Sequence, residues 1–157
     1  MWHGAPVLDQ IKLGITFFAL PYHYHTYQVT ELYVYFMDQC VASPSTCLFN
    51  EYKNFAFDNA LLNLSLTNMG RNEFITYWTT QVATEFGLDQ SELEAVYFQG
   101  NPYNVDATAR EFFKYASSNG VSGTPTAFIN GAMLDNIPTS VNLWLWQLEQ
   151  VYQSQFQ

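Results

Sequence analysis

Residues 120–134 read GVSGTPTAFINGAML, and this stretch decides the fold that the sequence predicts. A glycine-rich connection at 119–125 leads into the short apolar run 126–129, which predicts a strand. The Asn-Gly dipeptide at 130–131 is the strongest short signal for a hairpin turn, and residues 132–134 then predict the return strand. The final third of the chain therefore predicts a β-hairpin.

A further strand and a closing helix flank this pattern in the chain. The β-branched and aromatic run 15–20, which Pro21 stops, predicts a strand buried on both faces, and residues 6–13 predict the last turns of a helix. The closing helix starts at 138–140, and Leu143 and Trp146 fall off its apolar stripe and are expected to be exposed. Its expected buried face consists of Val141, Trp144, Leu145, Leu148, Val151 and Tyr152.

The middle of the chain predicts a block of helices. Apolar residues recur there at helical spacing, and Pro44, Gly70 and Gly87 are expected to end three of the helices. The segments with this spacing are 29–40, 49–64, 72–86 and 106–116, with a short helix from 91 onward. Strand, helical block, hairpin and closing helix in this order predict an α/β three-layer fold rather than a helix bundle.

Two motifs resemble those of DsbA-like thioredoxin-fold proteins. One is Phe-x-x-Leu-Pro-Tyr-His at 17–23, and the other is the stretch 120–131 quoted above. The resemblance implies an α/β, thioredoxin-like three-layer fold in a single domain over 1–157, with a helical insertion at about 28–118. It also implies that the peptide bond Thr124-Pro125 is cis and that Gly123, Thr124 and Pro125 form a ledge that binds an extended peptide.

The chain departs from that family at the redox site. It contains no Cys-x-x-Cys, and it begins where the helix that carries this motif would end, so an N-terminally truncated version of the fold is expected. The low-pKa thiolate that thiol–disulfide exchange requires is missing. We therefore predict no catalytic residue in this chain.

Two functional readings follow from this departure. The first is a redox-inactive thioredoxin-fold module that binds protein or serves as a structural component of an assembly. The second is a thiol–disulfide oxidoreductase whose Cys-x-x-Cys segment lies upstream or on another chain. In either case the strand that the family places between 15–20 and 126–129 is missing, so we expect another polypeptide to supply it, because unpaired interior backbone groups are costly.

Composition limits the other partners. The 157 residues include 14 acidic and 5 basic side chains, for a net charge of −9, which disfavours nucleic acid and anionic membrane surfaces. No apolar run approaches the roughly 18 residues that a membrane-spanning helix needs, so no membrane insertion is expected.

The two cysteines give information on the cellular location of the protein. Cys40 and Cys47 flank a turn-forming stretch, and either they form a local structural disulfide, which indicates the secretory pathway or the extracellular space, or they are two buried thiols of a cytoplasmic protein. The sequence leaves both open. Asn63 begins a glycosylation sequon, Asn-Leu-Ser, which weakly favours the secretory alternative.

Histidines are the remaining candidates for chemistry. His23 and His25 are two residues apart, but zinc needs three or four ligands and only His3 remains as a further histidine. The sequence also has no phosphate-binding or dinucleotide-binding fingerprint. We therefore expect no metal and no cofactor.

Overall fold

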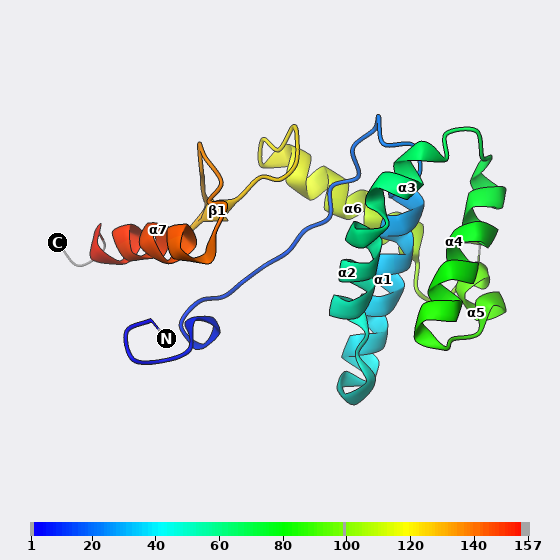
Figure 1. The fold of residues 1–157 in the computed structure, drawn as a ribbon, viewed down its shortest axis with the longest axis horizontal. Coiled ribbons are helices and arrows are strands. Elements are labelled where there is room, and N and C mark those ends of the chain that lie inside the picture. The colour runs from blue at the N-terminus through cyan, green and yellow to red at the C-terminus, as the bar shows by residue number, and fades with distance from the viewer. Residues whose placement is uncertain (1, 99, 155–157) are drawn as a thin grey trace. The chain divides into compact units, whose positions relative to one another are not determined.

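The computed structural model describes residues 2–98 and 100–154, and the chain divides into two compact units (Figure 1). The helical unit is Phe17–Gly120, and the terminal unit combines Met1–Thr16 with Val121–Gln157. The described residues form seven α-helices and one two-stranded hairpin, with no thioredoxin-like sheet. The expected α/β thioredoxin-like fold is therefore wrong. The expected helical segment 28–118 falls inside the helical unit, and the single domain stays a prediction.

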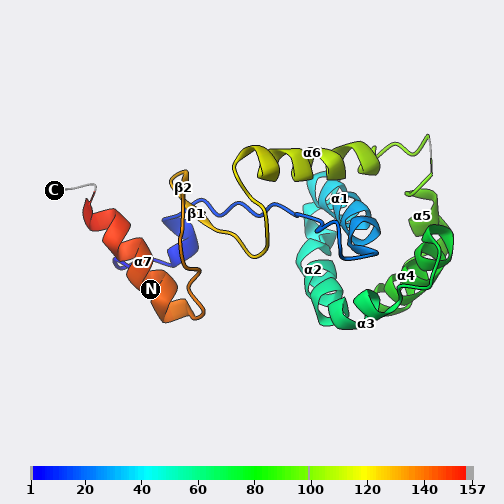
Figure 2. The ribbon, with the colours of Figure 1, turned by 90° about the horizontal axis from the view of Figure 1, so that it is seen from above.

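The helical unit is built around α1 (Thr26–Ala42). Five consecutive side chains of this helix, from Thr30 to Val34, are buried, so α1 is covered on more than one face and not along a single stripe. Helices α2 (Phe49–Asp58) and α6 (Val105–Ser118) both pack on α1 (Figure 2). The others are α3 (Ala60–Ser65), α4 (Arg71–Phe86) and α5 (Gln90–Ala95), of which the last two pack together.

A buried tyrosine connects three of these helices. The Tyr52 hydroxyl of α2 donates a hydrogen bond to the Val29 carbonyl of α1 at 2.7 Å and accepts one from Trp78 Nε1 of α4 at 3.0 Å. The Tyr52 ring also stacks on Phe36 of α1, with 4.5 Å between ring centroids. Tyr52 and Trp78 are both fully buried, so each polar atom depends on this arrangement for its partner.

We predict that Tyr52→Phe destabilises the helical unit. The substitution keeps the ring but leaves the buried Trp78 Nε1 without its acceptor, which costs about 1–3 kcal/mol of the free energy of unfolding. Urea unfolding followed by circular dichroism measures this loss. The exposed Tyr115→Phe is the matched control and should unfold like the wild type. Equal stability of Tyr52→Phe and the control would contradict the prediction.

Several helix ends are set by individual residues next to them in the sequence. Gly87 ends α4 with a φ of +66°, which is the left-handed conformation that glycine adopts without strain, as its position in the sequence predicted. The expected continuous helix 49–64 is interrupted at Asn59, whose side-chain amide donates to the Phe55 carbonyl at 2.8 Å. Helix α5 is capped by Asp89, which accepts hydrogen bonds from the backbone N–H groups of Ser91 and Glu92.

The predicted strand 15–20 is wrong, because this segment is irregular. Its apolar side chains pack on helices instead of entering a sheet. The Phe17 ring contacts Tyr33 of α1, the Phe18 ring stacks on Phe113 of α6 with centroids 4.7 Å apart, and Leu20 is buried. Because no vacant slot between two strands exists in the described residues, the expected recruitment of a missing central strand loses its basis.

The terminal unit contains the hairpin and the closing helix. Strands β1 (Phe128–Ile129) and β2 (Ala132–Met133) pair antiparallel, and α7 spans Val141–Ser154. The helical turns expected at 6–13 are reduced to one 3-10 turn, Val7–Asp9. No helix among the described residues is long and apolar enough to cross a membrane.

A disulfide joins Cys40 at the end of α1 to Cys47. The two cysteines enclose the turn that begins at Ser43 and continues as the 3-10 helix Pro44–Thr46. Of the two alternatives that the sequence left open, the structure therefore has the disulfide. The bond holds the connection between α1 and α2 in a short covalent loop.

We predict that the unreduced protein, once unfolded, contains no titratable thiol. Reduction should lower the free energy of unfolding by about 2 kcal/mol, because the bond closes a short loop and removes little entropy from the unfolded chain. Urea unfolding with and without reductant measures the effect. The double variant Cys40→Ser/Cys47→Ser is the control and should not respond to reductant. Two free thiols in protein from its native source would contradict the prediction.

Candidate functional site

The hairpin has the turn that its sequence predicts. Asn130 and Gly131 have φ values of +50° and +82°, as a two-residue type I′ turn requires. Phe128 pairs with Met133, and Ile129 pairs with Ala132 next to the turn. This register aligns two apolar side chains, Phe128 and Met133, across the strands on one face.

The ladder leaves one edge of β1 open. In an antiparallel hairpin, hydrogen-bonded and non-hydrogen-bonded pairs alternate, and the Leu134 N–H donates to the Ala127 carbonyl at 2.9 Å. The intervening pair, Phe128 with Met133, is therefore the non-hydrogen-bonded one, and its backbone N–H and C=O groups point outward. At 39% and 46% exposure, the two side chains are also accessible.

The three residues predicted to bind a peptide lie immediately before this edge. Thr124 and Pro125 are exposed, Gly123 is half-buried, and the Thr124-Pro125 peptide bond is cis, as the family resemblance implied. Thr126 Oγ1 donates to the Gly123 carbonyl at 2.7 Å, which closes the loop onto itself. The predicted ledge residues therefore lie in a bend just before β1.

The last turns of α7 bind the N-terminal segment of the same unit. Glu149 accepts a hydrogen bond from Trp2 Nε1 at 2.8 Å, and His3 Nε2 lies 2.7 Å from the same carboxylate oxygen. The hydrogen bonds from Trp2 and from Gln153, with that of His3, hold the pKa of Glu149 below its usual value. The Trp2 and His3 rings both contact Tyr152. These contacts attach the two ends of the chain to each other.

The rest of the terminal unit carries little charge and is at most half-buried. Of the expected buried face of α7, Trp144, Leu145, Leu148 and Val151 are half-buried, whereas Val141 and Tyr152 are exposed, at 73% and 40%. Leu143 and Trp146 are exposed, as the sequence predicted. The only charged side chains of this unit other than histidine are Asp9, Lys12, Asp135 and Glu149.

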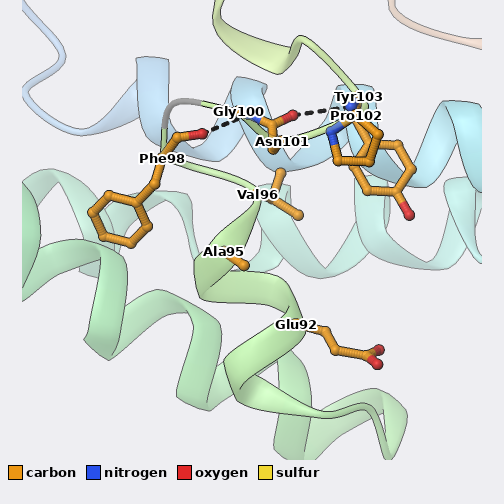
Figure 3. Close-up of a pocket in the computed structure, with 8 residues that line it drawn as sticks. All are labelled: Glu92, Ala95, Val96, Phe98, Gly100, Asn101, Pro102 and Tyr103. Atoms are coloured by element: carbon orange, nitrogen blue, oxygen red, sulfur yellow. Dashed lines mark hydrogen bonds between the residues drawn. The ribbon is translucent and has the colours of Figure 1, made fainter.

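Among the pockets of the helical unit, two lie beside α5 and the segment that follows it. The larger, of about 390 Å³, is lined by α5 and the loop that follows, and Figure 3 shows the Phe98 ring and the Glu92 carboxylate pointing away from each other. Asn101 holds this loop by donating to the Phe98 carbonyl and accepting from the Tyr103 N–H. The smaller pocket, of about 210 Å³, extends to Asp106. In neither pocket do several polar side chains point toward one position. A ligand-binding site needs a few such convergent polar groups.

The remaining predicted residues lie apart from the hairpin in the chain. Asn63 of α3 is only 6% exposed, a placement that disfavours the predicted glycosylation. His25 is buried against Phe74, with 3.9 Å between parallel rings, and its Nε2 is 2.9 Å from the Leu66 carbonyl, so it is a packed core residue. The described residues contain no group of three side chains that could hold a metal ion.

Sequence reasoning missed a buried carboxylate. Glu31 of α1 is 1% exposed, and its nearest cation is Arg71 of α4, at 3.6 Å. Glu31 lies beside the apolar stripe from which the sequence predicted α1. A charged residue at such a position is expected to be exposed to solvent. Only the packing of α4 and α6 on that side of α1 places it in the interior.

Comparisons with known proteins add no relative. No family model matches the chain, and neither the curated proteins nor the solved structures contain a significant match. The likeness to DsbA-like proteins therefore rests on the two motifs alone.

Proposed function

We propose that the chain is a polypeptide-binding module of a protein assembly and that it receives an extended strand of its partner on the outer edge of β1. The proposal includes no redox step, because both cysteines are joined to each other. The alternative reading, an oxidoreductase completed by a Cys-x-x-Cys segment from elsewhere, depended on a thioredoxin sheet that the described residues do not form.

The open edge of the hairpin carries this proposal. A sheet of two short strands is marginally stable in water, and a third strand stabilises it by pairing with the unused backbone groups. The outward-facing N–H and C=O of Phe128 provide such pairing groups, and the exposed residues Thr124 and Pro125 lie just before them in the chain. Proteins normally protect edges of this kind with charged side chains, and this one has none.

The chemistry of the terminal unit indicates the kind of strand. Phe128 and Met133 share one face of the hairpin, and a strand on the outer edge of β1 runs directly beside Phe128, so the incoming strand should place an apolar side chain opposite Phe128. The near absence of charge on this unit favours a neutral strand over a highly charged one, and nucleic acid is not part of the proposal. The disulfide favours an oxidising location, in the secretory pathway or outside the cell.

We predict that the full chain selects extended, apolar peptides from a random displayed library. N-methylating alternate residues of a selected peptide should weaken binding about tenfold or more at the positions that face β1 and have little effect at the others. Strand pairing uses every second backbone N–H, and each lost hydrogen bond costs about 0.5–1.5 kcal/mol in addition to the methyl clash. Isothermal titration calorimetry measures both series of peptides.

Two variants complete this test. Phe128→Pro removes the outward N–H and should abolish binding, whereas Phe128→Thr keeps the backbone and should retain part of it. Leu61→Arg, at an exposed position of α3 in the helical unit, is the control and should bind like the wild type. If N-methylation has no effect at either set of alternate positions in the peptide, strand addition is excluded. This outcome does not depend on whether Phe128→Pro disturbs the hairpin.

A further inference from the structure

Glu31 occupies an electrostatically unfavourable position at the packing interface of the helical unit. Its side chain is 1% exposed, and its Oε2 has no hydrogen-bond partner among the described residues. Arg71 Nη2 lies 3.6 Å from this oxygen, too far for a hydrogen bond, and the Arg71 side chain is 46% exposed. One half-solvated cation at this distance compensates poorly for burying a carboxylate.

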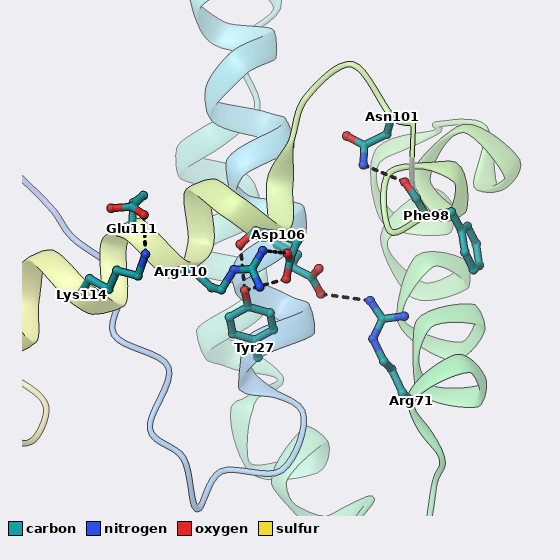
Figure 4. A network of polar contacts seen from close by, with 9 residues as sticks. Tyr27, Arg71, Phe98, Asn101, Asp106, Arg110, Glu111 and Lys114 are labelled. Carbon is teal, nitrogen blue, oxygen red and sulfur yellow. Dashed lines mark hydrogen bonds and ion pairs between the residues drawn. The ribbon is translucent and has the colours of Figure 1, made fainter.

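The other charged groups around Glu31 do not supply the missing partner. On α6, Asp106 and Arg110 form an ion pair with each other, and the Tyr27 hydroxyl of α1 donates to Asp106 Oδ1 at 3.0 Å. Figure 4 shows these three side chains gathered between α1 and α6. Tyr97, in the segment after α5, directs its hydroxyl to the Gln28 carbonyl at 2.9 Å. The negative charge of Asp106 acts on Glu31 in addition to burial.

These surroundings shift the titration of Glu31 strongly. Burial, which removes water from the carboxylate, raises the pKa of Glu31 to about 7. Arg71 and Arg110 lower it and Asp106 raises it, but burial has the largest effect. An unfolded chain leaves the same carboxyl near its ordinary value of 4.5.

We propose that Glu31 is a proton-binding site whose protonation tightens the packing of α1 against α4 and α6. The folded chain holds the proton below about pH 7. In the unfolded chain the same carboxyl is deprotonated unless the pH falls to about 4.5. Between these limits the folded state binds more protons, so its stability rises as the pH falls. Above neutral pH, Glu31 is charged in both states, and its burial opposes this packing. The helical unit is thus most tightly packed in a mildly acidic medium, whatever the terminal unit binds.

Hydrogen exchange on the full chain tests this proposal. Between about pH 8 and about pH 5.5, the opening of α1 amides, corrected for intrinsic exchange, should fall on the order of tenfold in the wild type. Glu31→Gln cannot take up the proton and should lose this response. Glu73→Gln, an exposed acid in the first turn of α4, is the matched control and should keep it. An unchanged response in Glu31→Gln would overturn the proposal.

A second measurement needs no variant. In carbon-13 spectra of the wild-type protein, one glutamate carboxyl resonance should titrate near neutral pH, well above the others. If every glutamate titrates in the ordinary range, the proposal is wrong, whether or not the Glu31→Gln variant folds.

Discussion

The Tyr52 hydroxyl is the contact on which the helical unit depends, because it is the one polar atom that joins α1, α2 and α4 in the described core. It donates to a backbone carbonyl of α1 and accepts from the indole of Trp78, and the Trp78 bond is fully buried. Such a bond is worth little net free energy when formed, but losing it leaves the buried indole N–H of Trp78 unpaired. The surrounding stack of Phe36, Tyr52, Phe55 and Trp78 therefore has little freedom to rearrange.

Glu31 shows the opposite use of burial in the same helix. Burial of the neighbouring Leu32 side chain is favourable because it removes apolar surface from water. The other neighbour, Thr30, is buried with its hydroxyl donating to the Thr26 carbonyl. Glu31 is buried because α1 is covered on several faces, and its nearest cation, Arg71, is 3.6 Å away and half-exposed. A helix covered on several faces buries residues outside its apolar stripe, whatever their charge.

Charge is divided unevenly between the two units. The helical unit contains 11 of the 14 acidic and 4 of the 5 basic side chains, whereas the terminal unit is nearly uncharged. The helical unit encloses a core, and the described residues of the terminal unit enclose none. An acidic, folded unit together with an apolar unit that has an open strand edge is the arrangement from which we infer strand binding.

Features that depend on a few neighbouring residues were predictable from the sequence. The Asn130–Gly131 turn and the glycine end of α4 involve short stretches of chain, so local conformational preference was sufficient to indicate them. For Cys40 and Cys47, proximity in the chain made a disulfide one of two alternatives, and the structure has the disulfide. Local sequence could not predict the structure of 15–20, because a strand forms only when it pairs with another strand. In this protein Phe17 and Phe18 pack against helices instead. The burial of Glu31 was likewise decided only by the tertiary structure, since which faces of α1 are covered depends on where α4 and α6 pack.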